Sequence, residues 1–409
     1  MEKRLSLYLI VVLLVSVSYI GFLSFMMDVL DRDEVLRDYP FQPPDDMSRF
    51  HFPDNEGLNT SIMSSVRLAG DYLVNHLSPK GRWDYEYNAT SGKSSSDYNL
   101  LRHAGTTYAL SLIFKYGRDP DHYNGSVRSM NYLLSRYMRF RWVDDSEIAI
   151  LSYGTCTKLG GPALVLMGIL QLKDVDPGLG YDREMRGCLN FILKMQRDDG
   201  SFQCYFGSRE DEQSDYYPGE AMLALSMYHR MRGGTAVLEA LKDAASFYNG
   251  HFPDGYTAYS PWATEALVYL DTIENNESFR MKAHAMARSC MRGQIYGGED
   301  PFVIGAFSSN PGASTASRIE SVCDAYLLAK RTDDHRNSTI YGYSIDLCAD
   351  FLMRFQLASG SVSGLPHPER ALGGVPNARD DLTIRIDNVQ HTAVVLIKVM
   401  VYQVGVEHI

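Results

Sequence analysis

The chain has 409 residues, of which 45% are hydrophobic and 22% are charged, a composition typical of a folded globular protein rather than a disordered one. Thirty-nine basic residues against fifty acidic residues give a net charge of −11, so the sequence lacks the cationic excess of a general phosphate-binding surface. We therefore expect no nucleic-acid partner. A closed barrel of this length forms as one domain, so the length alone does not demand two.

The first 27 residues predict a transmembrane signal anchor. Lys3 and Arg4 precede an uncharged stretch from residue 5 to residue 27, which is long enough to cross a bilayer as a helix. The stretch ends without a small-residue cleavage site, which favours an uncleaved anchor over a cleaved signal peptide. The positive-inside rule then places the N-terminus in the cytoplasm and the body outside. The membrane is thus one expected partner, and residues 28–58, rich in proline and acids, are the expected spacer.

Export agrees with five glycosylation sequons, each usable only where the asparagine is exposed; they begin at Asn59, Asn88, Asn124, Asn276 and Asn337. Six cysteines are spread through helical patterns without close pairing, so buried thiols are the preferred interpretation. The sequence contains no C-x-x-C and no H-E-x-x-H motif. We expect neither a structural metal nor a cofactor.

From residue 59 to residue 409 a pattern recurs six times: an amphipathic helix, a loop, and a second helix that is apolar on most sides. The amphipathic helices are expected at 59–77, 124–139, 181–196, 235–249, 277–293 and 339–356. The apolar helices are expected to begin near Tyr98, Gly154, Tyr217, Pro261, Thr315 and Ile384. A helix that is apolar all round must be enclosed by protein. The pattern predicts an all-α (α/α)6 barrel with six inner and six outer helices. In the alternative, an open α-solenoid, the first and last hairpins would not touch.

Twelve alternating helices with aromatic and acidic residues before each inner helix resemble the (α/α)6-toroid superfamily. That superfamily includes six-hairpin glycosidases, N-acylglucosamine 2-epimerase-like enzymes and terpenoid-cyclase-like proteins. Residues 196–202, QRDDGSF, are similar to the Q-x-x-D-G-S-F loop of cyclase-type repeats, whereas the acidic D-x-D-D motif of the cyclases does not occur in the sequence. The resemblance rests on architecture more than on a diagnostic motif, so it specifies the fold far better than an activity.

In such a toroid the inner helices run parallel, so their N-terminal ends open onto one face. Charged groups in the first turns of apolar helices need either ion-pair partners or a solvated cavity. The candidate catalytic carboxylates at these positions are Glu220, Glu265, Glu320 and Asp387. Each has two interpretations, a general acid or base and a structural partner of a nearby arginine.

Two histidines, His103 and His391, lie near the starts of the first and sixth inner helices. These helices are neighbours only in a closed ring, where the two rings could share a proton-transfer site. The candidate substrate-binding residues at the same face are Tyr98, Arg102, Tyr216, Tyr217, Trp262, Arg318 and Arg385. The aromatic rings offer surfaces on which sugars stack, and the guanidiniums suggest an acidic sugar.

Three functions remain open on this evidence, and all take a carbohydrate as partner. The favoured one is a glycoside hydrolase that uses two of the four carboxylates on an acidic, uronate-type glycan. The second is a sugar epimerase acting through His103 and His391. The third is a non-catalytic protein that binds or assembles glycans.

Overall fold

The structure, a computed structural model, describes residues 47–53, 57–152, 156–207, 212–253, 258–308 and 314–405. The expected membrane span at 5–27 and most of the expected spacer lie outside these residues. Of the helices within the described ranges, none combines the length and the apolar character needed to cross a membrane.

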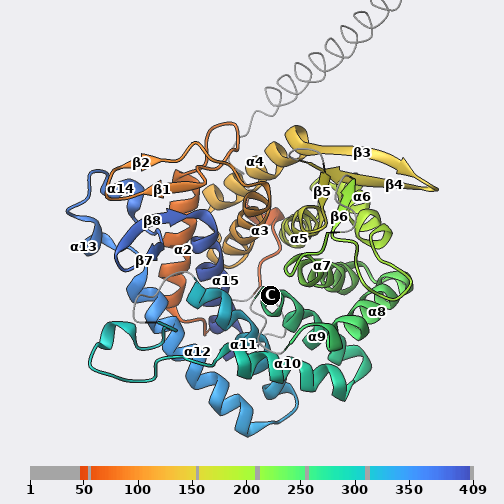
Figure 1. Cartoon of the computed structure of the whole chain (residues 1–409). Helices are drawn as coiled ribbons and strands as arrows, with labels where there is room; N and C mark the ends of the chain where they lie inside the picture. Colours follow the sequence, from red (N-terminus) through yellow and green to blue (C-terminus); the bar gives the residue numbers. More distant parts are fainter. Residues whose placement is uncertain are drawn as a thin grey trace, which may run out of the picture. The chain divides into compact units, whose positions relative to one another are not determined.

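Two concentric rings of helices make up the body (Figure 1). The outer ring consists of α2 (Thr60–Asn75), α4 (Pro120–Tyr137), α6 (Asp182–Lys194), α8 (Thr235–His251), α10 (Glu277–Cys290) and α12 (His335–Phe355). The inner ring consists of α3 (Leu100–Gly117), α5 (Gly160–Val175), α7 (Tyr217–Arg232), α9 (Ser260–Glu274), α11 (Ser314–Arg331) and α15 (Ile386–Gln403). The short helices η1 (Met47–Arg49), η2 (Pro301–Val303), α13 (Ser359–Val362) and α14 (Pro368–Ala371) lie outside the alternation.

The ring is closed, as predicted. Each inner helix packs against the next, and α15 completes the circle by packing against α3 and α2. Strand β1 (Glu86–Asn88) from the first hairpin pairs with β8 (Asp381–Arg385) from the sixth, with Glu86 opposite Arg385. The open solenoid is therefore excluded, and the (α/α)6 toroid is the fold of the described body.

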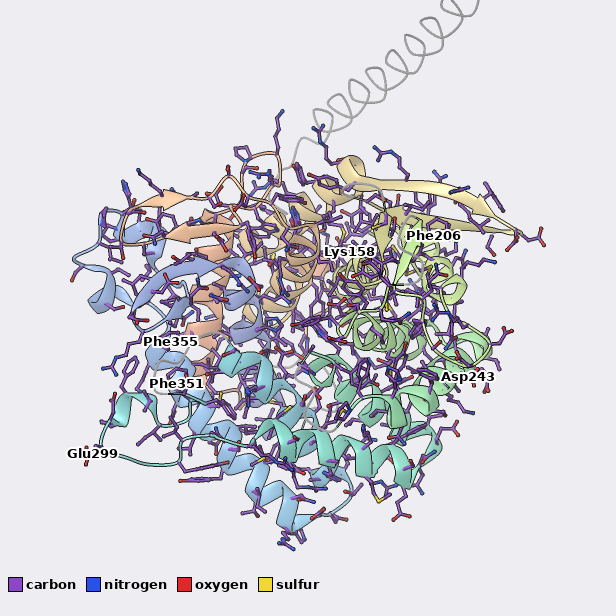
Figure 2. All side chains as sticks on the ribbon, viewed as in Figure 1. Lys158, Phe206, Asp243, Glu299, Phe351 and Phe355 are labelled. Carbon is purple, nitrogen blue, oxygen red and sulfur yellow. The ribbon has the colours of Figure 1, made fainter. Side chains whose placement is uncertain are left out.

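Burial separates the two rings in the way that the sequence pattern predicts. In α5 every residue except Asp174 is buried, whereas α2 buries only the stripe that faces the inner ring. Side chains of the inner helices fill the centre of the toroid (Figure 2). Removing so much apolar surface from water is the main force holding the rings together.

A recurring loop ties three of the hairpins to the outer helix of a neighbouring hairpin. The side-chain amide of Gln196 donates hydrogen bonds to the carbonyls of Gly200 and of Ala240 on α8, at 3.2 and 2.7 Å. Gly200 has φ +88°, and a Cβ there would lie 2.4 Å from the Asp243 carbonyl oxygen, so only glycine fits. The same pairing recurs with Gln294 bonded to Ser344 on α12 and with Gln356 bonded to Ser65 on α2. The resemblance in 196–202 thus marks a structural joint, and its third copy helps to close the ring.

The structure corrects one of the predicted helix starts and adds small strands. The second inner helix begins at Gly160 rather than near Gly154, because β5 (Cys156–Lys158) pairs there with β6 (Tyr205–Gly207). The sixth begins at Ile386, after β8. The two-stranded ladder β3 (Met138–Val143) and β4 (Ser146–Leu151) forms a hairpin, and β2 (Lys93–Ser94) and β7 (Pro376–Ala378) complete the four-stranded sheet β2-β1-β8-β7. A pattern of apolar residues alone does not separate a short strand from the first turn of a buried helix.

All six cysteines are free thiols, and all except the half-buried Cys156 are buried, as predicted. The sequons differ in accessibility. Asn59 is exposed, whereas Asn124 is 7% exposed inside α4, so this sequon cannot carry a glycan in the folded protein.

Candidate functional site

A cavity of about 420 Å³ opens at the N-terminal ends of the inner helices, where the sequence places the candidate site. Its size suits a small ligand. Seven of the predicted site residues share its wall with six others. The lining residues are Arg102, Tyr216, Glu220, Ala258, Pro261, Trp262, Ser314, Ser317, Asn377, Arg385, Asp387, Asn388 and His391.

Asp387 lies between two guanidiniums on the cavity wall. Arg385 holds it from Nε to Oδ1 at 3.0 Å and from its terminal nitrogen to Oδ2 at 2.5 Å. Arg102 adds a contact from Nε to Oδ2 at 3.2 Å. Burial by itself raises the pKa of Asp387, but the hydrogen bond from Arg385 and the charge of Arg102 outweigh it and lower the pKa. With both oxygens engaged by cations, Asp387 is a weak base.

His391 forms the second ionisable pair of the cavity. Its Nδ1 lies 2.6 Å from Glu320 Oε1, and the Glu320 carboxylate is almost fully buried behind it. An ionised carboxylate only accepts, so His391 Nδ1–H donates to Glu320, and whenever the ring is neutral its lone pair lies on Nε2. The Trp262 ring lies 6.1 Å from the imidazole, centroid to centroid. A histidine oriented by a carboxylate in this way can act as a general base.

Glu220 provides a third ionisable group, and its environment differs from those of the other two. Its side chain is buried, and its Oε2 has no hydrogen-bond partner among the described residues. Burial raises the pKa of Glu220 from 4.5 to about 7, against the smaller opposing effects of Arg102 and His391. A carboxyl group that keeps its proton near neutral pH at a cavity wall can act as a general acid.

Glu220 should make the stability of the protein depend on pH. Between pH 4.5 and 7 the unfolded chain releases this proton while the folded chain keeps it, so the free energy of unfolding falls as the pH rises. We expect Glu220→Gln to remove this dependence and to stabilise the protein by about 3 kcal/mol at pH 8 but little at pH 4.5. Denaturant unfolding at the two pH values measures it. Glu369→Gln, whose side chain is 72% exposed, is the control, and equal stabilisation by both variants would contradict the prediction.

The structure does not bring His103 to the cavity, contrary to the paired-histidine expectation. The ring is fully buried and packs against Tyr132 on α4, with its Nδ1 3.0 Å from the Tyr98 hydroxyl and its Nε2 2.8 Å from Ser129 Oγ. Burial lowers its pKa to about 3, so the ring is neutral. Successive residues on a helix point in different directions, so Arg102 faces the cavity while His103 faces the outer ring. Tyr98 lies with His103 and is likewise absent from the cavity wall.

Three further candidates contact other parts of the structure rather than the cavity. Glu265 lies deeper, where Lys398 Nζ donates to its Oε2 at 2.9 Å. Arg318 lies over the Phe307 ring, with its guanidinium carbon 5.3 Å from the ring centroid. Tyr217 packs edge-on against Tyr205 beside Glu220. None of the three is among the residues that line the cavity.

Sequence reasoning missed two asparagines at the cavity. Asn388 Nδ2 donates to Asn377 Oδ1 at 2.9 Å and to the Val375 carbonyl at 3.2 Å. Asn388 lies in the first turn of α15, and the first turns of the inner helices are the positions from which Asp387 was chosen as a candidate. Asn377 lies on β7, outside any inner helix, and no sequence signal marks it.

One group of side chains away from the cavity has the residue types of a metal site: the ligand atoms of Asp71, Asp119 and His122 lie within 4.8 Å of one another. His122 Nε2 donates to Asp71 Oδ1 at 2.9 Å, and its buried Nδ1 has no partner among the described residues. The ring proton is therefore on Nε2, the nitrogen that faces the carboxylate. Because Asp119 also caps α4, this group forms a structural contact between α2 and α4.

No family model and no curated protein matches the chain. Several solved structures match the chain in fold. A D-mannose isomerase is 13% identical, with a TM-score of 0.59 over 85% of this chain and 99% of its own. An α-1,6-mannanase of glycoside hydrolase family 76 from a Salegentibacter species is 10% identical, with a TM-score of 0.61 over 83% and 99%. A cellobiose 2-epimerase from Bacillus thermoamylovorans is 9% identical, with a TM-score of 0.59 over 83% and 99%. At such identities the likeness extends to the fold, so this chain shares the (α/α)6 toroid of mannanases and sugar epimerases.

Proposed function

We propose that the protein is a carbohydrate-active enzyme that transfers protons on a sugar, with His391 as the base and Glu220 as the acid. The observation that carries this proposal is the buried Glu220 carboxyl, whose pKa is about 7, on the wall of the same cavity as the His391 ring held by Glu320. The similar solved structures named as a sugar isomerase and a sugar epimerase support the substrate class.

The roles follow from the geometry. His391 Nε2 takes a proton from the carbon next to the carbonyl of an open-chain sugar, while Nδ1–H stays bonded to Glu320. Glu220 gives its proton to the carbonyl oxygen, and the Arg102 guanidinium, whose charge acts on Glu220, stabilises the negative charge that develops there. Return of the proton to the opposite face of the same carbon gives an epimer, and its return to the neighbouring carbon gives an isomer. In each case Glu220 takes back a hydroxyl proton of the enediol as the carbonyl group forms again. The proton that leaves carbon is thus replaced, and no other reactant is consumed.

Glycoside hydrolysis, the reaction favoured by the sequence, is the second candidate. Its support is the contrast between the raised pKa of Glu220 and the lowered pKa of Asp387. Three of the four candidate carboxylates are engaged, however: Asp387 by two arginines, Glu320 by His391 and Glu265 by Lys398. A hydrolase of this type needs a second carboxylate that is able to attack or to activate water. This requirement places proton transfer ahead of hydrolysis.

One experiment separates these functions. Wild-type protein is incubated in D2O with a panel of free aldoses, uronic acids and neutral or acidic oligosaccharides, and the products are followed by NMR. Deuterium appearing at the carbon next to the carbonyl supports proton transfer. If new reducing ends form without that exchange, the reaction is hydrolysis and the proton-transfer proposal is wrong. Binding without either product would leave a non-catalytic glycan-binding protein and overturn the enzymatic proposal.

An acidic sugar is the proposed substrate class. Two guanidiniums face one carboxylate at the cavity wall, and their side chains remain 35% and 34% exposed for Arg102 and Arg385. We expect Arg385→Ala to weaken binding of a uronic acid by about 2 kcal/mol, roughly 30-fold in Kd. Calorimetric titration with uronic and neutral sugars measures the change. Arg318→Ala, at the start of another inner helix but outside the cavity wall, is the matched control. If the wild-type protein binds neutral sugars more tightly than uronic acids, the proposal of an acidic substrate is wrong.

Gly160 positions Glu220. A Cβ at Gly160 would lie 1.9 Å from Glu220 Oε2 and 2.8 Å from Tyr217 Cδ1, so any side chain there displaces the acid. We expect Gly160→Ala to lower kcat roughly 10²-fold, the typical effect of a misplacement of about 1 Å. Gly180→Ala, where a Cβ meets nothing within 4 Å, is the control for kcat. Unchanged kcat in Gly160→Ala would argue against Glu220 as the acid.

We also propose that the body works outside the membrane that the N-terminal helix spans. The support is the Lys3 and Arg4 flank of the 5–27 segment and the export sequons, of which the one at Asn59 is exposed. Protease treatment of intact cells should degrade the body and spare a cytoplasmic control protein. A protected body would reverse the orientation, and a mature N-terminus beyond Met27 would reveal a cleaved signal.

A further inference from the structure

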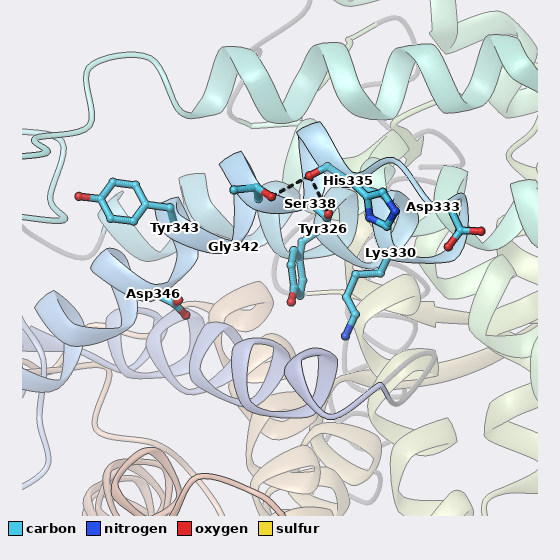
Figure 3. A pocket seen from close by; sticks show the side chains of 10 residues that line it. Tyr326, Lys330, Asp333, His335, Ser338, Gly342, Tyr343 and Asp346 are labelled. Atoms are coloured by element: carbon cyan, nitrogen blue, oxygen red, sulfur yellow. Dashed lines mark hydrogen bonds between the residues drawn. The ribbon is translucent and has the colours of Figure 1, made fainter.

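A second groove of about 490 Å³ runs between α11 and α12, away from the catalytic cavity (Figure 3). It is lined by Tyr326, Ala329, Lys330, Asp333, His335, Ser338, Thr339, Gly342, Tyr343 and Asp346. Ser317 lines the cavity and Lys330 lines the groove thirteen residues later on the same helix, a separation of about 20 Å along the axis. The two sites are therefore separate.

Aromatic rings flank this groove and are unusually exposed. Tyr343 is 56% exposed and stacks on Tyr296, which is 45% exposed, with ring centroids 6.0 Å apart and planes 12° apart. Gly342 lies beside the half-buried Tyr326 ring, where a Cβ would lie 3.3 Å from Tyr326 Cε2 and a longer side chain would enter the groove. The Lys330 ammonium lies over the same ring, 5.5 Å from its centroid. Exposed rings that are stacked in a fixed orientation mark a binding surface.

Polar groups of the groove are held in place but keep capacity to accept. The Ser338 and Thr339 hydroxyls donate to the His335 carbonyl at 3.2 and 2.7 Å, which leaves their lone pairs available (Figure 3). Asp346 Oδ1 accepts from Gln403 Nε2 at 2.5 Å, and Oδ2 forms no hydrogen bond with the described side chains of the groove. The groove thus offers acceptors to a ligand rich in hydroxyl groups.

The charges of the groove indicate which sugars fit. Lys330 Nζ already donates to the carbonyls of Tyr402 and Gln403 at the end of α15, at 3.2 and 3.4 Å. Asp333 and Asp346 add two carboxylates to the lining. With more carboxylates than ammonium groups, the groove disfavours uronate, sulfate and phosphate groups.

We propose that the groove between α11 and α12 is a second glycan-binding site, which takes a neutral oligosaccharide segment by stacking on Tyr343 and Tyr326 and by hydrogen bonding to Asp346 and the hydroxyls of α12. The proposal rests on the proposed function in one respect, that the ligand is a carbohydrate. Two sites on one body hold a long glycan more firmly than either holds a short one, because the second contact forms at high effective concentration. The site acts in binding only, so small substrates do not require it.

Affinity electrophoresis of the full chain in mild detergent tests the proposal, with soluble α-mannan and hydroxyethyl cellulose as neutral polymers and polygalacturonate as the acidic one. We expect a neutral polymer to retard the wild type, and Tyr343→Ala and Gly342→Gln to weaken that binding tenfold or more. Gly342→Gln blocks the groove at a helical position where a side chain favours the helix, and the melting temperature of each variant is measured to verify that it folds. Trp142→Ala removes a 69% exposed ring from β3 and is the matched control.

The outcomes separate this site from the catalytic cavity. The measurement is repeated with His391→Ala, which should bind the neutral polymer as the wild type does. If only the groove variants lose polymer binding, and the wild type forms no product from any sugar, the glycan-binding groove is supported and the enzymatic proposal is wrong. Equal retardation of wild type, Tyr343→Ala and Gly342→Gln, or no retardation of the wild type by either neutral polymer, would overturn the groove.

Discussion

Replacing His391 by alanine is expected to lower kcat roughly 10²-fold to 10⁴-fold, the usual contribution of a positioned general base. The variant removes the only imidazole on the cavity wall as far as the described residues define it, and leaves Glu320 buried without its partner. Glu320→Gln keeps the imidazole ring of His391 and should lower kcat by a smaller factor. Steady-state kinetics on the sugar identified by deuterium exchange gives both values.

The pH profile distinguishes catalysis from a structural role. Glu220 must carry its proton to act as the acid, so kcat of the wild type should fall as the pH rises above about 7. Glu220→Gln should be slow at every pH and lack that descending limb. His229→Ala, at the far end of an inner helix with its Nδ1 bonded to Tyr269, serves as the control for histidine loss. A normal rate in His391→Ala, or a descending limb that persists in Glu220→Gln, would remove these residues from the mechanism.

Replacing Lys398 by methionine is expected to lower the free energy of unfolding by about 3 to 5 kcal/mol, because it strands buried carboxylates. Lys398 Nζ donates to Asp324 at 2.9 and 2.8 Å and to Glu265 at 2.9 Å, and the Tyr402 hydroxyl donates to Asp324 at 3.2 Å. Burial alone lowers the pKa of Lys398, but the charges of Asp324 and Glu265 outweigh it and raise the pKa, so the ammonium stays charged. This network joins α9, α11 and α15 one to two turns below the cavity.

The loss in Lys398→Met should depend on pH. Burial raises the pKa of Asp324 even in the presence of Lys398, so the buried carboxylates of the variant become protonated and uncharged as the pH falls. The loss in free energy of unfolding should therefore shrink toward pH 5. Denaturant unfolding at pH 5 and pH 8 measures the difference. Lys194→Met breaks an exposed pair with Asp144 and should cost about 1 kcal/mol or less. A triple variant that also carries Glu265→Gln and Asp324→Asn should recover much of the loss. Equal deficits for Lys398→Met and Lys194→Met would contradict the assignment.

Glu265 and Glu320 show why one sequence rule produced two outcomes. Both lie near the start of an apolar inner helix, and both are almost fully buried. Glu320 meets His391 at the cavity, whereas Glu265 meets Lys398 deeper in the core. The partner of each is on α15, more than 70 residues away in the chain. Periodicity places a residue at a depth along its own helix but carries no information on which distant side chain lies opposite.

The recurring glutamine joints show the same limit. Gln196 and Gly200 stand four residues apart in a recognisable loop, but Gln294 pairs with Gly305 and Gln356 with Gly373, at spacings of 11 and 17 residues. Only the closed ring shows that the three loops make the same contact. Each bonds an outer helix of another hairpin, and Gln356 reaches back to α2.

By itself the sequence determined the alternation of exposed and buried helices, the count of six hairpins, the buried thiols and the face on which a site would lie, because these follow from hydrophobic periodicity along single helices. The tertiary structure alone decided that Arg102 rather than His103 faces the cavity, that Arg385 and Arg102 hold Asp387, and that Glu220 Oε2 has no hydrogen-bond partner within the part of the chain that the structure describes. Those outcomes depend on the rotation of each helix about its axis and on contacts between hairpins far apart in the chain. Helix rotation is set by packing against neighbours, and packing is a property of the closed ring rather than of any one segment.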